Sequence, residues 1–199
     1  MVKYGLSKMY RGLRLSMCYL LLLQTCYFIA CNSDSNEAAT VVSDWIGKKI
    51  VFPSNIPCTR LGEPVPCEPQ TSIYKVLLYI DSIGCTSCDL RIDEWKKIIS
   101  ESQSNSLKKL SFHFYFNPRK GEDLSDLFKR ENFKEQVYID KDDLLNKENK
   151  FLTQMTFQCF LLNEKDEVVL VGNPTLNSNI RKIYLDLIHN KFTPGQTKE

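Results

Sequence analysis

A continuous apolar strand that passes directly into a Cys-x-x-Cys motif is the feature that most constrains the fold of this chain. Residues 75–81 (KVLLYID) form a short apolar run with β-branched and aromatic members, which predicts a strand buried on both faces. A helix is predicted over residues 86–103, because apolar side chains recur there at helical spacing. These side chains are Cys88, Ile92, Trp95 and Ile99. The motif Gly84-Cys85-Thr86-Ser87-Cys88 therefore lies where a buried strand passes into a helix.

The two cysteines at this junction have the spacing of a reactive dithiol. A cysteine in the first turn of a helix faces unpaired backbone N–H groups and the positive end of the helix dipole, which favours thiolate over thiol. Cys88 comes one turn further along the same face. A thiolate at Cys85 can attack a substrate disulfide, and Cys88 can then attack the mixed disulfide and release the product. We therefore predict that Cys85 and Cys88 are catalytic.

The remaining apolar segments predict a mixed α/β sheet. Strands are expected over residues 45–53, 110–116, 136–140, 157–162 and 167–172, and helices over residues 122–133, 142–149 and 178–190. The turn at residues 163–166 (NEKD) predicts that the last two strands form a hairpin. His113 is expected to be a hydrogen-bonded residue of its strand. This order of elements predicts a layered α/β fold with both parallel and antiparallel strand pairs.

The first thirty residues have the pattern of an export signal. Four basic residues come first, and residues 15–30 are then mostly apolar, a run shorter than the roughly 20 residues of a membrane-spanning helix. The sequence Phe28-Ile29-Ala30-Cys31 resembles a bacterial lipobox and is followed by a polar segment. This resemblance implies that Cys31 is the lipid-modified first residue of the mature chain. A plain signal peptide cut near Ala30, or an uncleaved anchor, is the alternative.

The net charge changes sign once the signal is removed. The full chain carries a formal charge of +2, whereas residues 31–199 hold 22 basic and 24 acidic side chains. Binding to nucleic acid needs a basic excess that releases counterions from phosphates. We therefore expect no nucleic-acid partner.

Five cysteines remain in the mature chain beside Cys31, and export favours disulfides among them. A structural disulfide is predicted between Cys58 and Cys67, because the turn-forming loop between them can bring its ends together. Cys159 lies in an apolar run and is expected to be a buried thiol. A zinc site built from Cys58, Cys67, Cys85 and Cys88 is disfavoured, since their spacing matches no common zinc motif. We predict neither a metal nor a cofactor.

From about residue 72 to residue 190 the sequence resembles the thioredoxin superfamily, particularly the lipid-anchored periplasmic thiol-disulfide oxidoreductases of Gram-negative bacteria. The resemblance rests on the GCTSC motif and the order of elements. It implies a three-layer thioredoxin-like fold, in which helices flank a mixed central sheet, with an N-terminal strand and loop extension. It also implies an exposed nucleophile at Cys85 and a buried resolving thiol at Cys88. The expected organisation is a lipoprotein signal peptide (1–30), a polar tether (31–42), the extension (43–71), the thioredoxin-like domain (72–192) and a C-terminal tail (193–199).

Three positions depart from the pattern of that family. Gly84 stands where a tryptophan is common, Tyr79 where a buried acid is often found, and Met155 where the family has a cis-proline. A cis bond before a residue other than proline costs about 2.5 to 4 kcal/mol, which favours a trans bond at Met155. The resemblance nevertheless implies a set of residues close to the substrate. They are Gly84, Thr86, Ser87, Met155 and Thr156.

Two functions are compatible with the sequence. The first is a lipid-anchored thiol-disulfide oxidoreductase in the Gram-negative cell envelope, facing the periplasm or the cell surface. Its partners would be exported proteins with thiols or disulfides, a membrane thiol reductant or oxidant, and the membrane itself through the lipid anchor. The second is a non-catalytic lipoprotein of the same fold, a binding or structural module in which Cys85 and Cys88 form a permanent disulfide.

Overall fold

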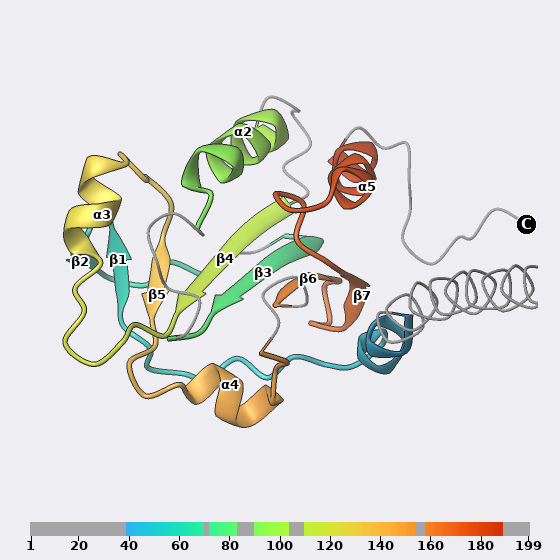
Figure 1. Cartoon of the computed structure of the whole chain (residues 1–199), viewed down its shortest axis with the longest axis horizontal. Coiled ribbons are helices and arrows are strands. Elements are labelled where there is room, and N and C mark those ends of the chain that lie inside the picture. The colour runs from blue at the N-terminus through green and yellow to red at the C-terminus, as the bar shows by residue number, and fades with distance from the viewer. Residues whose placement is uncertain (1–38, 70–71, 83–89, 104–109, 154–157, 189–199) are drawn as a thin grey trace, which may run out of the picture. The chain divides into compact units, whose positions relative to one another are not determined.

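The structure is a computed structural model, and it describes residues 39–69, 72–82, 90–103, 110–153 and 158–188. The chain forms two compact units, Met1–Asp44 and Trp45–Glu199. In the first unit residues 39–44 are helical, although the sequence predicts a polar tether as far as residue 42. Ala39, Val41 and Val42 make this end of the predicted tether less polar than its beginning. All strands of the described residues belong to the second unit (Figure 1).

A mixed sheet of seven strands, in the order β2-β1-β5-β4-β3-β6-β7, forms the centre of the second unit. The strands are β1 (Cys58–Arg60), β2 (Glu63–Val65), β3 (Tyr74–Ile80), β4 (Leu110–Phe116), β5 (Val137–Ile139), β6 (Cys159–Leu162) and β7 (Val168–Val171). The β3–β4 and β4–β5 pairs are parallel, and the other pairs are antiparallel. The predicted mixture of parallel and antiparallel pairs is thus confirmed, as is the predicted hairpin of β6 and β7.

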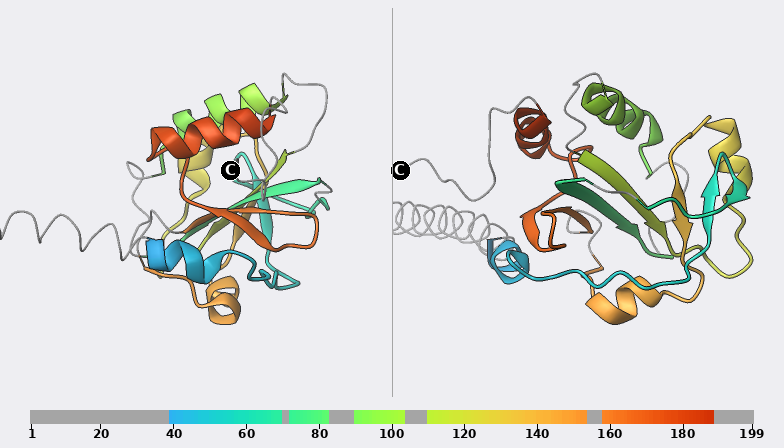
Figure 2. Two further views of the ribbon diagram at one scale, coloured as in Figure 1. Left: turned by 90° about the vertical axis from the view of Figure 1, so that its right-hand side faces the viewer. Right: turned by 180° about the vertical axis from the view of Figure 1, so that it is seen from behind.

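Two layers cover the sheet. Four helices of the second unit are described: α2 (Ile92–Gln103), α3 (Ser125–Arg130), α4 (Leu144–Asn149) and α5 (Ser178–Ile188). Figures 1 and 2 show α2 and α5 side by side over one face, with α4 and the segment that leads into β1 across the other. Helices therefore flank a mixed central sheet, which confirms the predicted three-layer α/β fold.

The face under α2 and α5, called here the helix face, is packed with apolar side chains. Alternate residues of β3 and β4 point to it, and on the helical side Trp95 lies edge-on to Phe114 with ring centroids 5.4 Å apart. Ile92, Trp95 and Ile99 are buried, which confirms this part of the predicted helical stripe. The main buried side chains from the strands are Val76, Leu78, Ile80, Phe112, Phe114, Phe116, Cys159 and Leu161.

The opposite face, called here the strap face, is aromatic and carries polar atoms. Its rings include Tyr79, which lies 5.0 Å from Phe151, and Tyr115, which stacks on Tyr138 at 4.2 Å. The segment at residues 45–57 lies across it. Trp45 packs against Phe151 and Phe160, and Phe52 packs against His113 and Tyr115.

The strand predicted over residues 45–53 is wrong, because this segment makes only an isolated bridge between Lys49 and Glu167. Its backbone bonds run to the start of β7 and the turn before it: Gly47 N–H donates to the Val168 carbonyl and Ile50 N–H to the Asp166 carbonyl, both at 2.8 Å. Pairing ends there because the partner chain turns at residues 163–166.

The loop predicted between Cys58 and Cys67 contains the β1–β2 hairpin. Leu61 and Gly62 join the strands, and both have positive φ (52° and 75°), as a tight two-residue hairpin turn requires. Gly62 also lies against the Ser125 backbone, where a Cβ would meet the carbonyl oxygen at 2.3 Å. This close approach fixes the hairpin on the start of α3.

The helix predicted over residues 122–133 is shorter than expected. The α3 helix spans Ser125–Arg130 and ends before Asn132, whose φ of 49° is left-handed. The side chains of Leu124, Leu127 and Phe128 are buried, as the sequence predicts.

Candidate functional site

The predicted dithiol follows the carboxyl end of β3, a strand in the middle of the sheet. The described chain stops at Ser82 and resumes at Leu90, so Cys85 and Cys88 lie outside the described residues, together with Gly84, Thr86 and Ser87. The same holds for Met155 and Thr156 and for the predicted lipidation site at Cys31. The roles of these residues stay predictions. The structure describes the residues on either side of them.

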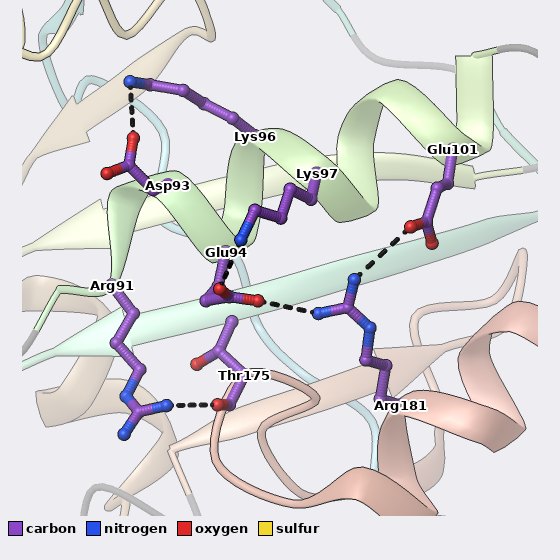
Figure 3. Close-up of polar contacts among 8 residues, drawn as sticks. All are labelled: Arg91, Asp93, Glu94, Lys96, Lys97, Glu101, Thr175 and Arg181. Atoms are coloured by element: carbon purple, nitrogen blue, oxygen red, sulfur yellow. Dashed lines mark hydrogen bonds and ion pairs between the residues drawn. The ribbon is translucent and has the colours of Figure 1, made fainter.

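The start of α2 differs from the sequence prediction. Leu90 and Arg91 are not helical, and Arg91 has a φ of 45°, so the helix begins at Ile92 rather than continuing from residue 86. The Arg91 guanidinium donates a hydrogen bond of 2.7 Å to the Thr175 carbonyl (Figure 3). A helix dipole acts on its first turn. The prediction of one continuous helix from residue 86 is therefore wrong, whereas the lowered pKa expected of Cys85 concerns a residue outside the described chain and stays a prediction.

Gln158 connects the two chain segments that lead to the predicted site residues. Its side chain is buried, and its amide donates to Asp81 Oδ2 at 3.0 Å and to the Leu152 carbonyl at 2.9 Å. The backbone carbonyl of Gln158 accepts a hydrogen bond from the Tyr79 N–H at 2.9 Å. Asp81 comes just before residues 83–89, whereas Leu152 and Gln158 flank residues 154–157. Asp81 and the two residues that flank 154–157 are thus held together where β3 ends and β6 begins.

Sequence reasoning missed Gln158. The available signal was a lone amide at the start of the apolar run at residues 157–162. An amide in such a run is buried without partners unless it bonds to something outside its own strand.

Tyr79 takes the position where the proteins that the sequence resembles often have a buried acid. It is buried, and its hydroxyl donates to Asp143 Oδ1 at 2.5 Å. Burial, followed by this bond to a carboxylate, raises the pKa of Tyr79 far above its ordinary value. The phenol therefore stays protonated and cannot serve as a base. The half-buried Asp81 follows β3 and precedes the predicted dithiol by a few residues in the sequence.

His113 and Cys159 are buried and take part in packing. Burial, followed by the charge of Lys75, lowers the pKa of His113 to about 4, so the imidazole is neutral at pH 7. Its Nε2 lies 3.2 Å from the Ser111 hydroxyl, within the strand, as expected. Burial raises the pKa of Cys159 to about 12, which keeps it a thiol beside the Tyr184 hydroxyl. The prediction that Cys159 is a buried thiol is confirmed.

Cys58 and Cys67 form a disulfide, with Cα atoms 5.3 Å apart. This is the pairing that the sequence predicts, and it joins the first residue of β1 to the chain just after β2. Because both sulfurs are in the disulfide, neither can be a ligand of the alternative zinc site that would combine them with Cys85 and Cys88. Among the described residues no group of three or more His, Cys, Asp or Glu side chains could hold a metal ion. None of the helices in this part of the chain has the length and apolar character needed to cross a bilayer.

A cavity of about 820 Å³ opens beside Ser82, at the carboxyl ends of the parallel strands β3, β4 and β5. Its walls come from the β1–β2 hairpin, the segment at residues 117–125, and residues 139 and 141. Arg119 joins this wall to the end of the described chain before the predicted dithiol, because its Nε donates to the Ser82 carbonyl at 2.8 Å. In open α/β sheets, ligands bind beyond the carboxyl ends of the strands.

A network of charges joins α2 to α5 (Figure 3). Arg181 bonds to Glu94 at 2.9 Å and approaches Glu101 at 3.4 Å, and Lys97 bonds to Glu94 at 2.7 Å. The hydrogen bonds from Lys97 and Arg181 lower the pKa of Glu94 below its ordinary range. Together with the bond from Arg91 to the Thr175 carbonyl, these contacts tie the start of α2 to the chain around α5.

The strand order, the flanking helices and the segment of the dithiol between β3 and α2 define a thioredoxin-like fold. Among solved structures, a solution structure of a thioredoxin-like protein in the oxidized form is similar to this chain with a TM-score of 0.51 and 10% identity, covering 75% of this chain and 99% of that one. At this identity the similarity is one of fold.

Two further structures align less closely. The bacterioferritin comigratory protein of Xanthomonas campestris has a TM-score of 0.49 and 10% identity, covering 71% of this chain and 96% of that one. StoA of Bacillus subtilis has a TM-score of 0.43 and 16% identity, covering 66% and 98% of the two chains. The sequence matches no protein-family model and no curated protein.

Proposed function

We propose that this chain is a lipid-anchored thiol-disulfide oxidoreductase that acts on exported proteins through Cys85 and Cys88. The observation that carries the proposal is the position of the Gly84–Cys88 segment in a thioredoxin-like fold. It follows the carboxyl end of a central strand and precedes α2 in the sequence, and Met155 and Thr156 come shortly before β6, the strand that pairs with β3. The bonds of Gln158 to Asp81 and to Leu152 hold the bases of the two segments together.

The proposed reaction is an exchange of disulfides. The Cys85 thiolate attacks a sulfur of the client disulfide, forms a mixed disulfide and releases one client thiolate. The Cys88 thiolate then attacks the Cys85 sulfur, forms the Cys85–Cys88 disulfide and releases the second client thiol. The client gains two electrons and the protein loses two. A thiol reductant at the membrane returns the pair to the dithiol, and a thiol oxidant would drive the reverse reaction.

The basic leader, the apolar run and the lipobox-like residues before Cys31 support anchoring of the mature chain in the cell envelope of a Gram-negative bacterium. Lipid on one cysteine would hold the domain at a membrane surface facing the periplasm or the outside of the cell. The Cys58–Cys67 disulfide fits an exported protein, because such bonds persist in oxidising compartments.

Trapping of mixed disulfides tests the reaction. We expect a Cys88→Ser variant expressed in a Gram-negative cell to accumulate covalent complexes with exported proteins, because the attacking thiol remains and the resolving thiol is gone. The complexes would be seen on non-reducing gels and would disappear on addition of a reductant. Cys85→Ser is the matched control, and it should trap nothing. Equal behaviour of the two variants would contradict the proposal.

The second candidate is a non-catalytic module of the same fold, in which Cys85 and Cys88 form a permanent disulfide. The observation that favours it is Tyr79, a protonated phenol where the family often has an acid for proton transfer. The two candidates differ in reduction potential, because permanent structural disulfides lie below about −300 mV. A Cys85–Cys88 potential well above that value supports the enzyme, and a value below it supports the module.

A further inference from the structure

The cavity beside Ser82 is a feature of the described surface that the proposed reaction leaves unused. Its volume of about 820 Å³ lies within the range of about 300 to 1,000 Å³ that ligand sites occupy. Apolar side chains form much of its wall. They include Pro57, Pro64, Leu124, Phe128 and Ile139. The cavity can therefore bury apolar parts of a ligand.

Cationic side chains outnumber acidic ones around the cavity. The cations are Arg119, Lys120 and Lys141, and the acids are Glu122 and Asp123. Both acids already accept bonds from nearby backbone: Glu122 from the Arg119 N–H at 3.0 Å, and Asp123 from the Ser125 N–H at 2.9 Å. Lys120 and Lys141 are exposed, and neither has an ion pair within the described part of the chain. The lining therefore carries an excess of one positive charge, and Lys141 is near enough to Asp123 to contribute, after the bonds from Ser125, to the lowered pKa of that carboxyl.

The cavity lies within reach of the predicted dithiol. Ser82, which lines it, precedes Cys85 by three residues, and three residues span at most about 11 Å when extended. Arg119 fixes the wall at this point through its bond to the Ser82 carbonyl. A polypeptide whose cysteine reacts with Cys85 could therefore place residues a few positions away in the cavity.

We propose that this cavity is a specificity site that binds the residues next to the reacting cysteine of a client polypeptide and favours an acidic side chain among them. The proposal rests on the function proposed above. Lys120 and Lys141 attract the client carboxylate, while the apolar wall accepts a neighbouring apolar side chain. Attraction between opposite charges steers association and selects among clients that carry the same cysteine.

Matched peptides test the site. Each carries one cysteine as a mixed disulfide with thionitrobenzoate, an apolar residue, and Glu, Gln or Lys three positions before the cysteine. Attack by the reduced protein on the peptide sulfur releases the coloured thiolate, so that a second-order rate constant can be measured. We expect the Glu peptide to react about five- to tenfold faster than the Lys peptide, with the Gln peptide between them. Added salt should reduce the difference.

Reversing the charges of Lys120 and Lys141 tests whether these side chains cause the preference for the Glu peptide. The Lys120→Glu/Lys141→Glu variant should react faster with the Lys peptide than with the Glu peptide. The Lys165→Glu/Lys182→Glu variant is the matched control, because it changes the net charge equally at two exposed lysines away from the cavity. This control variant should react with the Glu, Gln and Lys peptides in the same order of rates as the native protein. The same order in both variants, or equal rates for the three peptides with the native protein, would overturn the proposal and leave the oxidoreductase function standing.

Failure of the proposed function would give a different result. The native protein would then release no coloured thiolate from any of the three peptides, as a Cys85→Ser variant should. A cysteine-free Glu peptide with a fluorescent label tests the cavity without the reaction. Fluorescence anisotropy should detect binding to the native protein and to Cys85→Ser, with weaker binding to Lys120→Glu/Lys141→Glu. Equal affinity of the native protein for Glu and Lys peptides would refute the cavity site.

Discussion

The two faces of the central sheet are built from the same strands but depend on different interactions. Even-numbered residues of β4 point to the helix face and are apolar, whereas the odd-numbered Ser111, His113 and Tyr115 point to the strap face. In β3 the helix face likewise receives Val76 and Leu78, and the strap face receives Tyr79. A mainly apolar run therefore has one face that needs only packing and another whose polar atoms need hydrogen-bond partners.

The largest effect is expected from removing a ring on the helix face. Trp95→Ala leaves a cavity between α2 and β4 and should reduce the free energy of unfolding by about 3 to 5 kcal/mol, measured in urea. Trp95→Phe is the control. The Trp95 Nε1 is buried without a hydrogen-bond partner in the described structure, so this change keeps most of the packing and loses no bond. A similar loss in both variants would mean that more than packing holds this face.

The strap face should be the acid-sensitive one, because His113 lies there. Its pKa is about 4 in the folded protein and about 6.5 in the unfolded chain, so the unfolded state binds more protons between these values. Stability is therefore full above pH 6.5, falls as the pH drops toward 4, and loses about 3 kcal/mol in all from this group. Urea unfolding at several pH values measures the loss. His113→Gln should flatten the curve in this window, and an unchanged curve would assign the acid sensitivity to other groups.

A smaller effect is expected for the hydroxyl of Tyr79 on the strap face. Tyr79→Phe keeps the ring against Phe151 and removes the bond to Asp143, which should reduce stability by about 1 to 2 kcal/mol. Asp143→Asn is the control, because its amide oxygen still accepts the tyrosine bond, and it should cost less. If Tyr79→Phe leaves the urea midpoint unchanged, packing alone holds this face as well.

The smallest effect on stability is expected from Arg181, whose ion pairs join α2 to α5 without belonging to the apolar core of the helix face. Its partners Glu94 and Glu101 lie at the surface, where water and salt screen ion pairs. Arg181→Ala should therefore lower the urea midpoint less than Tyr79→Phe does, and the loss should shrink at high salt. The Arg181→Lys variant keeps the positive charge but lacks the guanidinium that contacts both Glu94 and Glu101, so it shows whether charge alone is sufficient. A loss as large as that of Trp95→Ala would show that the charged network, rather than the core, joins α2 to α5.

The sequence predicted the elements whose signal is local. The runs that form β3 and β4 and the turn between β6 and β7 could be identified because each is written in consecutive residues. Residues 45–53 were misassigned, since apolar side chains are equally suited to a strand and to a segment that lies across a sheet. The start of α2 was misplaced because Arg91 adopts a left-handed φ of 45° without the glycine that usually signals one.

The candidate site also has features that a local stretch of sequence predicts and features that it does not. The GCTSC motif and the turn residues between Cys58 and Cys67 are local, and they pointed to the dithiol and to the disulfide. The bonds of Gln158 and the cavity could not be predicted, because they join residues far apart in the chain. Pro57, Ser82, Arg119 and Lys141 meet at one cavity only after β3, β4 and β5 have paired.

The shared amide of Gln158 has a consequence for how the protein could be altered. One NH₂ group, with two hydrogens, satisfies both Asp81 and the Leu152 carbonyl, so neither segment can shift outward without breaking a bond that also aligns the other. The same residue also accepts the Tyr79 N–H through its backbone carbonyl, so its side chain extends the pairing of β3 with β6 to Asp81 and Leu152. Loop grafting at either place would have to preserve this crosslink, whereas exchanges at the far ends of the same strands would not disturb it.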